Sequence, residues 1–144
     1  VGGVGFWPGL PGMMPIDPRC QHSVPKYDPP RSSTVAGAIG VGGGFTSIYP
    51  MDTPGGYHLI GRTPIPIFST DTRLAPFRHG ATLFRPGDRV RFRPIDVDTF
   101  KDIEGAVAAG AYRYEISDYT LFSLERHRAW CADLADDDAG DSPW

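Results

Sequence analysis

Long apolar runs and cysteines are both scarce in this chain of 144 residues. The longest weakly polar stretch, residues 35–48, contains seven Gly, Ser or Thr residues and is too short to cross a bilayer. The N-terminus lacks the basic start and apolar run of a secretory signal. Two cysteines, Cys20 and Cys131, are too few for a disulfide scaffold. We therefore expect a cytoplasmic protein with free thiols, the alternative being a Cys20–Cys131 disulfide.

Lysine is also rare, because twelve of the fourteen basic residues are Arg and only Lys26 and Lys101 are Lys. Residues 1–94 hold ten basic and five acidic side chains, whereas residues 95–144 hold four and twelve. Arg presents a planar fork to carboxylates and phosphates. The pattern indicates a front portion that receives an anionic group and an acidic tail that stays solvated, or else ordinary surface charge. The net charge of −3 argues against nucleic-acid binding.

Several motifs of nucleotide, biotin and hydrolase sites are missing from the sequence. It contains no GxxxxGK loop and no GxSxG elbow, and its glycine runs form no dinucleotide fingerprint. Neither lysine lies between methionines, so the chain carries no biotin-attachment site. The candidate ligands for a metal ion are Cys20, His22, His127 and Cys131. Their spacing matches no common zinc pattern. We expect no cofactor or metal bound by this chain.

The composition of the chain and its short β-prone runs favour a mainly β fold. A hydrophobic content of 40% is enough for a core, and 18 Gly and 15 Pro, frequent through the first 95 residues, exclude a long helical bundle. Short runs of β-prone residues between Gly and Pro turns predict strands. In Arg89–Ile95, for example, apolar and arginine side chains alternate as on a half-buried strand. The predicted strands are 34–40, 45–49, 57–62, 65–68, 89–95 and 112–116, and their spacing suggests a barrel or sandwich.

The last third of the chain changes character. Asp98 is predicted to cap a helix that runs to about residue 109 and stops at Gly110, and Ser123 is predicted to cap a second helix. The predicted organisation is a barrel over 1–95, a helix-strand-helix extension over 96–135 and an acidic tail over 136–144.

The densest polar cluster lies on two predicted strands joined by the turn Pro54–Gly56. A hairpin at this turn would place the side chains on neighbouring positions. Arg and Tyr bind carboxylates or carbonyls, and bare glycine backbone lets a ligand approach closely. A ligand site and ordinary surface polarity are both consistent with this cluster. Its members are Thr46, Ser47, Tyr49, Asp52, His58, Arg62 and Thr63.

Residues 44–50 read GFTSIYP and residues 54–64 read PGGYHLIGRTP. This pair resembles the pattern GGQTGIYPxxSPGGWxxIGRTP of the carboxyltransferase/allophanate hydrolase subunit 1 family. Three further motifs resemble family patterns in the same order: GFWPGLP at 5–11, PR followed by VAGAIG within 30–40, and PGDRVRF at 86–92. The resemblance covers residues 5 to about 95. Residues 110–124 are also similar to the segment that leads out of this domain in urea carboxylases.

The family includes the carboxyltransferase region of urea carboxylase, the sporulation kinase inhibitor KipI and one component of the bacterial 5-oxoprolinase. The resemblance implies a cyclophilin-like β-barrel, here closed or nearly closed with two short C-terminal helices, and a second homologous barrel that completes the active site. The implied reaction moves a carboxyl group from carboxybiotin, on a biotinylated carrier, to a urea-like amide nitrogen, with ATP handled elsewhere. An α/β portion normally precedes the first motif, so we expect a fragment, a processed product or a reduced homologue that is inactive alone.

The resemblance also suggests roles for residues of the polar cluster. Arg62 and Tyr49 would be catalytic and polarise the carboxyl or acceptor carbonyl, since charge develops on oxygen during transfer. Thr46 and His58 would orient the acceptor. The remaining residues expected to bind substrate are Gly55, Gly56 and Arg31.

Three departures from the family patterns stand out. Phe45 replaces the usual Gln, Ser47 replaces Gly, and residues 10–13 read LPGM where the family has FPYL. Losing the amide at Phe45 removes a donor and an acceptor that would hold urea or a carboxylate. We therefore expect either a different substrate or a degenerate site. The alternatives to a urea carboxylase-like enzyme are a KipI-like regulatory module that catalyses nothing and a component of an ATP-dependent 5-oxoprolinase.

Overall fold

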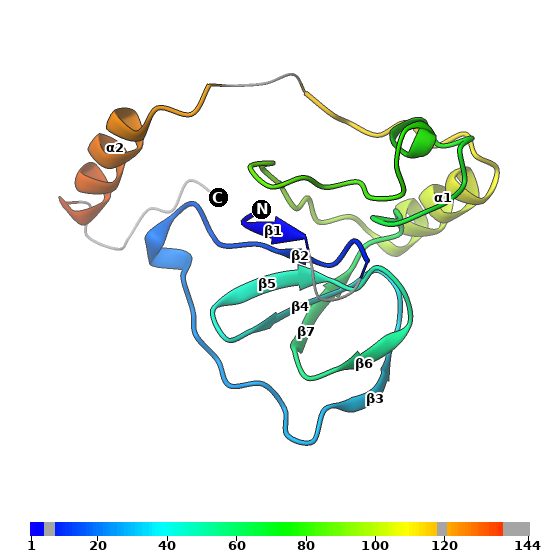
Figure 1. Ribbon diagram of the computed structural model, residues 1–144, viewed down its shortest axis with the longest axis horizontal. Helices are drawn as coiled ribbons and strands as arrows, with labels where there is room; N and C mark the ends of the chain where they lie inside the picture. The colour runs from blue at the N-terminus through cyan, green and yellow to red at the C-terminus, as the bar shows by residue number, and fades with distance from the viewer. Residues whose placement is uncertain (5–7, 118–120, 137–144) are drawn as a thin grey trace.

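The computed structural model describes residues 1–4, 8–117 and 121–136. Short strands occupy the N-terminal part and two helices the C-terminal part (Figure 1). Residues 5–7 of the first motif, residues 118–120 and the tail from residue 137 onward lie outside the described residues. The elements are β1 (Gly3–Val4), β2 (Pro11–Gly12), β3 (Arg31–Thr34), β4 (Ala38–Gly42), β5 (Phe45–Ile48), β6 (Thr53–Gly55), β7 (His58–Arg62), α1 (Val97–Ala108) and α2 (Leu124–Asp136), with 3₁₀ turns at Pro18–Cys20 and Ala75–Arg78.

A three-stranded antiparallel sheet in the order β5-β4-β7 forms the centre of the molecule. Strands β4 and β5 form a hairpin whose turn residues, Gly43 and Gly44, have φ of 59° and 84°. These left-handed angles are easily adopted only by glycine. The predicted hairpin between the segments of β5 and β7 is therefore wrong, because β4 lies between them.

A second small sheet pairs β3 with β6, so Pro54 and Gly55 lie in a strand rather than in a hairpin turn. The predicted strand at 34–40 is divided between two sheets at Gly37, whose φ is 79°. A Cβ at this position would collide with the carbonyl oxygen of Thr63. The chain thus changes direction at a position where a side chain does not fit.

Three other predicted strands do not form. Residues 65–68 contribute only an isolated bridge from Phe68 to Thr82, and neither 89–95 nor 112–116 pairs with a strand among the described residues. Alternating side chains are not sufficient for a strand, since its backbone groups also need a partner. In 89–95 only Val90 packs against the core, and Phe92 is exposed.

The main hydrophobic core covers one end of the central sheet. Met13, Ile39, Ile48 and Ile67 are buried together, and Ile39 and Ile48 are cross-strand partners. The half-buried side chains that complete this core are Val1, Leu83, Phe84 and Val90. The core therefore depends on contacts between β4, β5 and segments distant in the sequence.

Both predicted helices form, with one change of cap. The cap of α1 is Asp96 rather than Asp98, because the Asp96 carboxylate accepts a 2.7 Å hydrogen bond from the Thr99 amide. Gly110, with φ of 70°, follows the end of α1 as expected. The Ser123 hydroxyl accepts a 3.2 Å hydrogen bond from Arg126 N–H at the start of α2. In Figure 1, α1 and α2 lie at opposite ends of the molecule.

The expectation of antiparallel strands with two C-terminal helices is confirmed, whereas the expected closed or nearly closed barrel is not confirmed in the described residues. Within residues 1–4, 8–117 and 121–136 they form three separate sheets, β1-β2, β3-β6 and β5-β4-β7. A closed barrel requires each strand to pair on both sides. In its sheet β7 pairs with β4 alone, whereas β5 pairs with β4 and also forms a bridge from Thr46 to Met13, next to β2. No helix in the described ranges is long and apolar enough to span a bilayer.

Candidate functional site

The two faces of the central sheet have different surroundings. Side chains alternate along β4, so Ala38, Gly40 and Gly42 belong to one face, here called the glycine face. Ile39 and Val41 belong to the opposite face, here called the pocket face. Paired residues on neighbouring antiparallel strands share a face, so the register assigns the predicted site residues to one side or the other.

The glycine face is closed by tyrosines. A Cβ at Gly40 would lie 2.9 Å from Tyr57, and one at Gly42 would lie 2.7 Å from the Tyr57 ring. Tyr49 is buried and meets the Tyr57 ring edge-on, with centroids 6.5 Å apart. A Cβ at Gly55 would collide with the Tyr49 hydroxyl. Burial, together with nearby Tyr49, raises the pKa of Tyr57.

Arg31 and His58 join this tyrosine packing to the N-terminal segment. The Arg31 guanidinium donates a 2.6 Å hydrogen bond to the Tyr57 carbonyl and lies 5.7 Å from the Tyr27 ring. The Tyr27 ring lies 4.4 Å from the His58 ring, and the Tyr27 amide donates to the Gly56 carbonyl at 2.8 Å. The structure thus brings together Arg31, Gly56 and His58 around Tyr27. Sequence reasoning missed Tyr27, which stands alone in a Pro-rich lead-in with no local signal.

Arg62 lies on the glycine face, as the cross-strand partner of Ala38. Its side chain is about half exposed and points to α1, where its guanidinium lies 3.6 Å from the Glu104 carboxylate and 5.5 Å from the Phe100 ring centroid. Tyr49 is buried near Tyr57 on the same face. The two predicted catalytic residues therefore have different surroundings, one at the α1 surface and one inside the tyrosine packing.

The pocket face carries a row of Thr46, Val41 and His58 across three strands. Val41 pairs with Thr46 on β5 and with His58 on β7. Thr46 also forms backbone hydrogen bonds of 2.9 Å with Met13 in both directions. His58 Nε2 lies 2.8 Å from the Pro25 carbonyl oxygen. Thr46 and His58, predicted to orient the acceptor, thus share a face that does not include Arg62.

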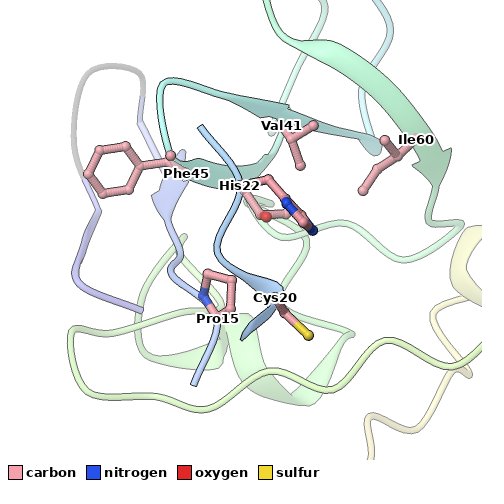
Figure 2. Close-up of a pocket in the computed structure, with 8 residues that line it drawn as sticks. Pro15, Cys20, His22, Val41, Phe45 and Ile60 are labelled. Carbon is pink, nitrogen blue, oxygen red and sulfur yellow. The ribbon is translucent and has the colours of Figure 1, made fainter. Parts of the chain in front are cut away.

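A shallow pocket of about 220 Å³ opens on this face beside Thr46. The sheet forms one wall and the segment 15–22 forms the other. Figure 2 shows Val41 and Ile60 pointing toward the His22 ring, while the Phe45 ring projects away from them. The lining residues are Pro15, Cys20, His22, Val41, Gly44, Phe45, Thr46 and Ile60. The sequence suggests Cys20 as a metal ligand or disulfide partner and His22 as a metal ligand, and their place beside β4 depends on contacts between distant segments.

The other members of the predicted polar cluster stabilise the backbone. The Ser47 hydroxyl donates a 2.7 Å hydrogen bond to the Pro11 carbonyl, and the Asp52 carboxylate accepts a 2.8 Å bond from the Ala36 amide. The Thr63 hydroxyl accepts from the Ile65 amide at 3.4 Å. These residues hold loops together and do not line the pocket.

Both thiols are free, as expected. Cys131 lies on α2, where its sulfur is 3.6 Å from His127 Nε2. Cys20 lies in the pocket lining beside His22. Among residues 1–4, 8–117 and 121–136, no group of three or more His, Cys, Asp or Glu side chains is arranged to hold a metal ion.

Residues 1–77 match the family model for the carboxyltransferase domain, subdomain C and D. The chain belongs to this family. The resemblance drawn from the motifs is thereby confirmed. Every residue that lines the pocket lies inside the matched part of this carboxyltransferase domain.

Relatives of this carboxyltransferase domain are parts of larger enzymes. The chain is 34% identical over 122 residues to the urea amidolyase of Saccharomyces cerevisiae, covering 85% of the chain and 6% of that protein. It is 42% identical over 91 residues to a 5-oxoprolinase subunit of Escherichia coli O157:H7, covering 63% of the chain and 38% of that protein. The crystal structure of Kluyveromyces lactis urea carboxylase superposes with a TM-score of 0.78 at 29% identity, over 88% of the chain and 11% of the enzyme. The chain thus spans only a small part of these relatives.

Proposed function

We propose that this domain supplies the acceptor pocket of a biotin-dependent carboxyltransferase. The reaction would move a carboxyl group from carboxybiotin, carried by a partner domain, to the nitrogen of a urea-like amide. One observation supports this proposal above the others: a small pocket beside Thr46 is built entirely from the part of the chain that matches the carboxyltransferase family. A second, homologous carboxyltransferase domain and a biotinylated carrier would complete the site.

The pocket provides two things that such a transfer requires. The Thr46 hydroxyl offers one donor and two acceptor lone pairs to an amide group. The apolar wall of Val41 and Ile60 keeps water from the reacting carboxyl group once a partner covers the opening. In the transfer, the acceptor nitrogen would give up a proton and bond to the carboxyl carbon as the bond from that carbon to the biotin nitrogen breaks. The electron pair of the broken bond would stay on the biotin nitrogen, which would take up the proton. Negative charge develops on the carboxyl oxygens, so donors aimed at them accelerate the step.

The residues that would stabilise this negative charge have two candidate locations. Thr46 lines the pocket, and His58 lies on the same face of the sheet without lining the pocket. Arg62 lies on the opposite face with its charge near Glu104. One small acceptor does not reach both faces of a sheet. We therefore assign acceptor binding to the pocket face and treat Arg62, on the glycine face, as the alternative centre.

Paired substitutions in the complete enzyme distinguish these centres. Thr46→Val keeps the shape of the side chain and removes its hydroxyl, and it is expected to lower kcat/KM for carboxyl transfer by about 100-fold. Arg62→Ala removes an exposed charge and is expected to change kcat/KM less than about threefold. The opposite ranking would place the transfer at Arg62 and contradict the assignment to the pocket.

Partner dependence tests the function itself. The isolated chain is expected to show no ATP- or biotin-dependent turnover, and activity is expected only with the second carboxyltransferase domain and a biotinylated carrier. Carboxylation of an acceptor by the chain alone would contradict the proposal, and so would a failure to bind any second-domain homologue by light scattering.

A second function is favoured by the 42% identity to the 5-oxoprolinase subunit of Escherichia coli O157:H7. In that case the chain would act with partner subunits in ATP-dependent opening of 5-oxoproline, whose ring also contains an amide. Measuring ATP-dependent consumption of 5-oxoproline beside urea carboxylation, with matched partners for each, decides between them. Binding of a partner without either activity would indicate the regulatory, KipI-like role.

A further inference from the structure

We infer that the pocket selects an acceptor with an apolar substituent on its urea or amide group, rather than urea itself. This inference concerns the substrate class and rests on the proposed function. The apolar side chains in the lining are Pro15, Val41 and Ile60, while the ring of Phe45 projects away from them. The polar side chains in the lining are Cys20, His22 and Thr46.

The volume of the pocket exceeds what urea needs. One bound water needs roughly 10–15 Å³ of such space, and the pocket offers about 220 Å³. Urea has four non-hydrogen atoms and would leave much of this space to water. A ligand with several additional carbon atoms would fill the space and displace that water.

The polar and apolar parts of the pocket are arranged to orient such a ligand. Thr46 and Val41 are cross-strand partners, so a hydroxyl and an apolar side chain lie side by side on the sheet. Val41 and Ile60 are both apolar side chains of the sheet that face the His22 ring (Figure 2). An amide group at Thr46 would place its substituent against Val41 and Ile60.

Ile60 has a large exposed apolar surface that a ligand in the pocket would cover. It is 64% exposed, although large apolar side chains are stabilised by burial. It occupies the irregularity in the pairing of β7, where Leu59 pairs with Gly40 and Gly61 pairs with Ile39. A ligand against Val41 would cover Ile60 and remove its apolar surface from water, which favours binding.

The test is a comparison of phenylurea with urea, titrated into the purified chain and followed by NMR chemical shifts. Phenylurea is expected to bind at least about tenfold more tightly. Ile60→Thr keeps a β-branched side chain and shortens the apolar wall, so it is expected to weaken phenylurea binding about fivefold. Equal affinities for the two ligands in the unaltered chain would overturn the inference.

A neighbouring residue provides the matched control. Leu59 is 47% exposed on the same strand, but its side chain lies near Gly40 of the glycine face. Leu59→Thr is expected to change phenylurea affinity less than twofold, and an effect as large as that of Ile60→Thr would count against the pocket. If Ile60→Thr fails to fold, as judged by circular dichroism, Val41→Thr replaces it with the same expected loss.

The experiments distinguish an error in the inferred substrate class from an error in the proposed function. If phenylurea binds through Ile60 but is not carboxylated with the partner domain and carrier present, the proposed function fails and the binding site stands. If the complete enzyme carboxylates urea with a higher kcat/KM than phenylurea, the inference about substrate class fails and the proposed function stands.

Discussion

The two faces of the central sheet differ in what covers them. On the glycine face, a Cβ at Gly42 would overlap the Tyr57 ring and one at Gly40 would overlap the Tyr57 Cβ. On the pocket face, Thr46 and Val41 line an open pocket, and Ile60 beside them is largely exposed. The same three strands therefore carry the tyrosine packing on one side. On the other side they carry the core around Ile39 and Ile48 at one end and the open pocket beside Thr46.

This difference changes the interpretation of the glycine-rich motifs. In the sequence, Gly55 and Gly56 suggest bare backbone that a ligand approaches. In the structure, the space above Gly55 is occupied by Tyr49, and Gly56 lies close to the Tyr27 backbone. Gly44 is the glycine that lines the pocket. Most glycines of these motifs thus serve packing or turns.

The largest expected effect is on stability, from Gly42→Ala on the glycine face. Its methyl group would overlap the Tyr57 ring, and overpacking of this kind costs about 1–3 kcal/mol in the free energy of unfolding. Gly61→Ala is the control on the pocket face, since a Cβ there would make only an ordinary contact of 3.7 Å with Ile39. It is expected to be neutral or slightly stabilising. Urea denaturation measures both.

A double variant identifies Tyr57 as the cause. In a Tyr57→Ala background, Gly42→Ala is expected to cost much less than it does alone, because the overlapping ring is gone. Equal costs in the two backgrounds would show that something other than tyrosine packing requires glycine at this position.

A smaller effect is expected from Arg31→Ala, and it separates packing from substrate binding. Loss of the 2.6 Å hydrogen bond to the Tyr57 carbonyl is expected to destabilise the fold by about 1–2 kcal/mol. Phenylurea affinity is expected to stay within twofold, because Arg31 does not line the pocket. A loss of affinity without a loss of stability would restore the substrate-binding role suggested by the motif. The exposed Arg78 provides the control, as Arg78→Ala.

The smallest expected effect concerns pH. Burial raises the pKa of Tyr57, so the folded chain keeps this phenol neutral at a pH where the unfolded chain ionises it. The resulting contribution to stability is present below the ordinary tyrosine pKa, near about 10, and is lost as pH rises through the folded value. Tyr57→Phe is expected to reduce the fall in urea midpoint between neutral and alkaline pH. Tyr27→Phe, at an exposed ring, is expected to leave that fall unchanged.

The sequence predicted the elements of this fold better than their pairing. Strands at 45–49 and 57–62, the Gly110 stop and the Ser123 cap all depend on local patterns, and each is present. The partner of a strand depends on contacts between distant segments. The Pro54–Gly56 segment looked like a hairpin turn, yet the hairpin of the sheet closes at Gly43 and Gly44.

The candidate site shows the same difference between local patterns, which the sequence predicts, and contacts between distant segments, which it does not. Thr46 was found from its motif and lies in the pocket, and Ile60 belongs to the same motif without having been singled out. Cys20 and His22 reach the pocket only because the N-terminal segment runs along the sheet. Arg62 was grouped with Thr46 by proximity in sequence, but the register of β7 places it on the other face.

The irregular pairing of β7 also determines how substitutions can change one face of the sheet without changing the other. A one-residue slip in a regular strand would exchange every side chain between faces. Here Ile60 stands outside the ladder, between the paired residues Leu59 and Gly61. Replacing it alters the wall of the pocket without disturbing the tyrosine packing behind it. If the pocket binds the acceptor as proposed, a lineage or a protein engineer could vary the acceptor at this single position while the scaffold stays the same.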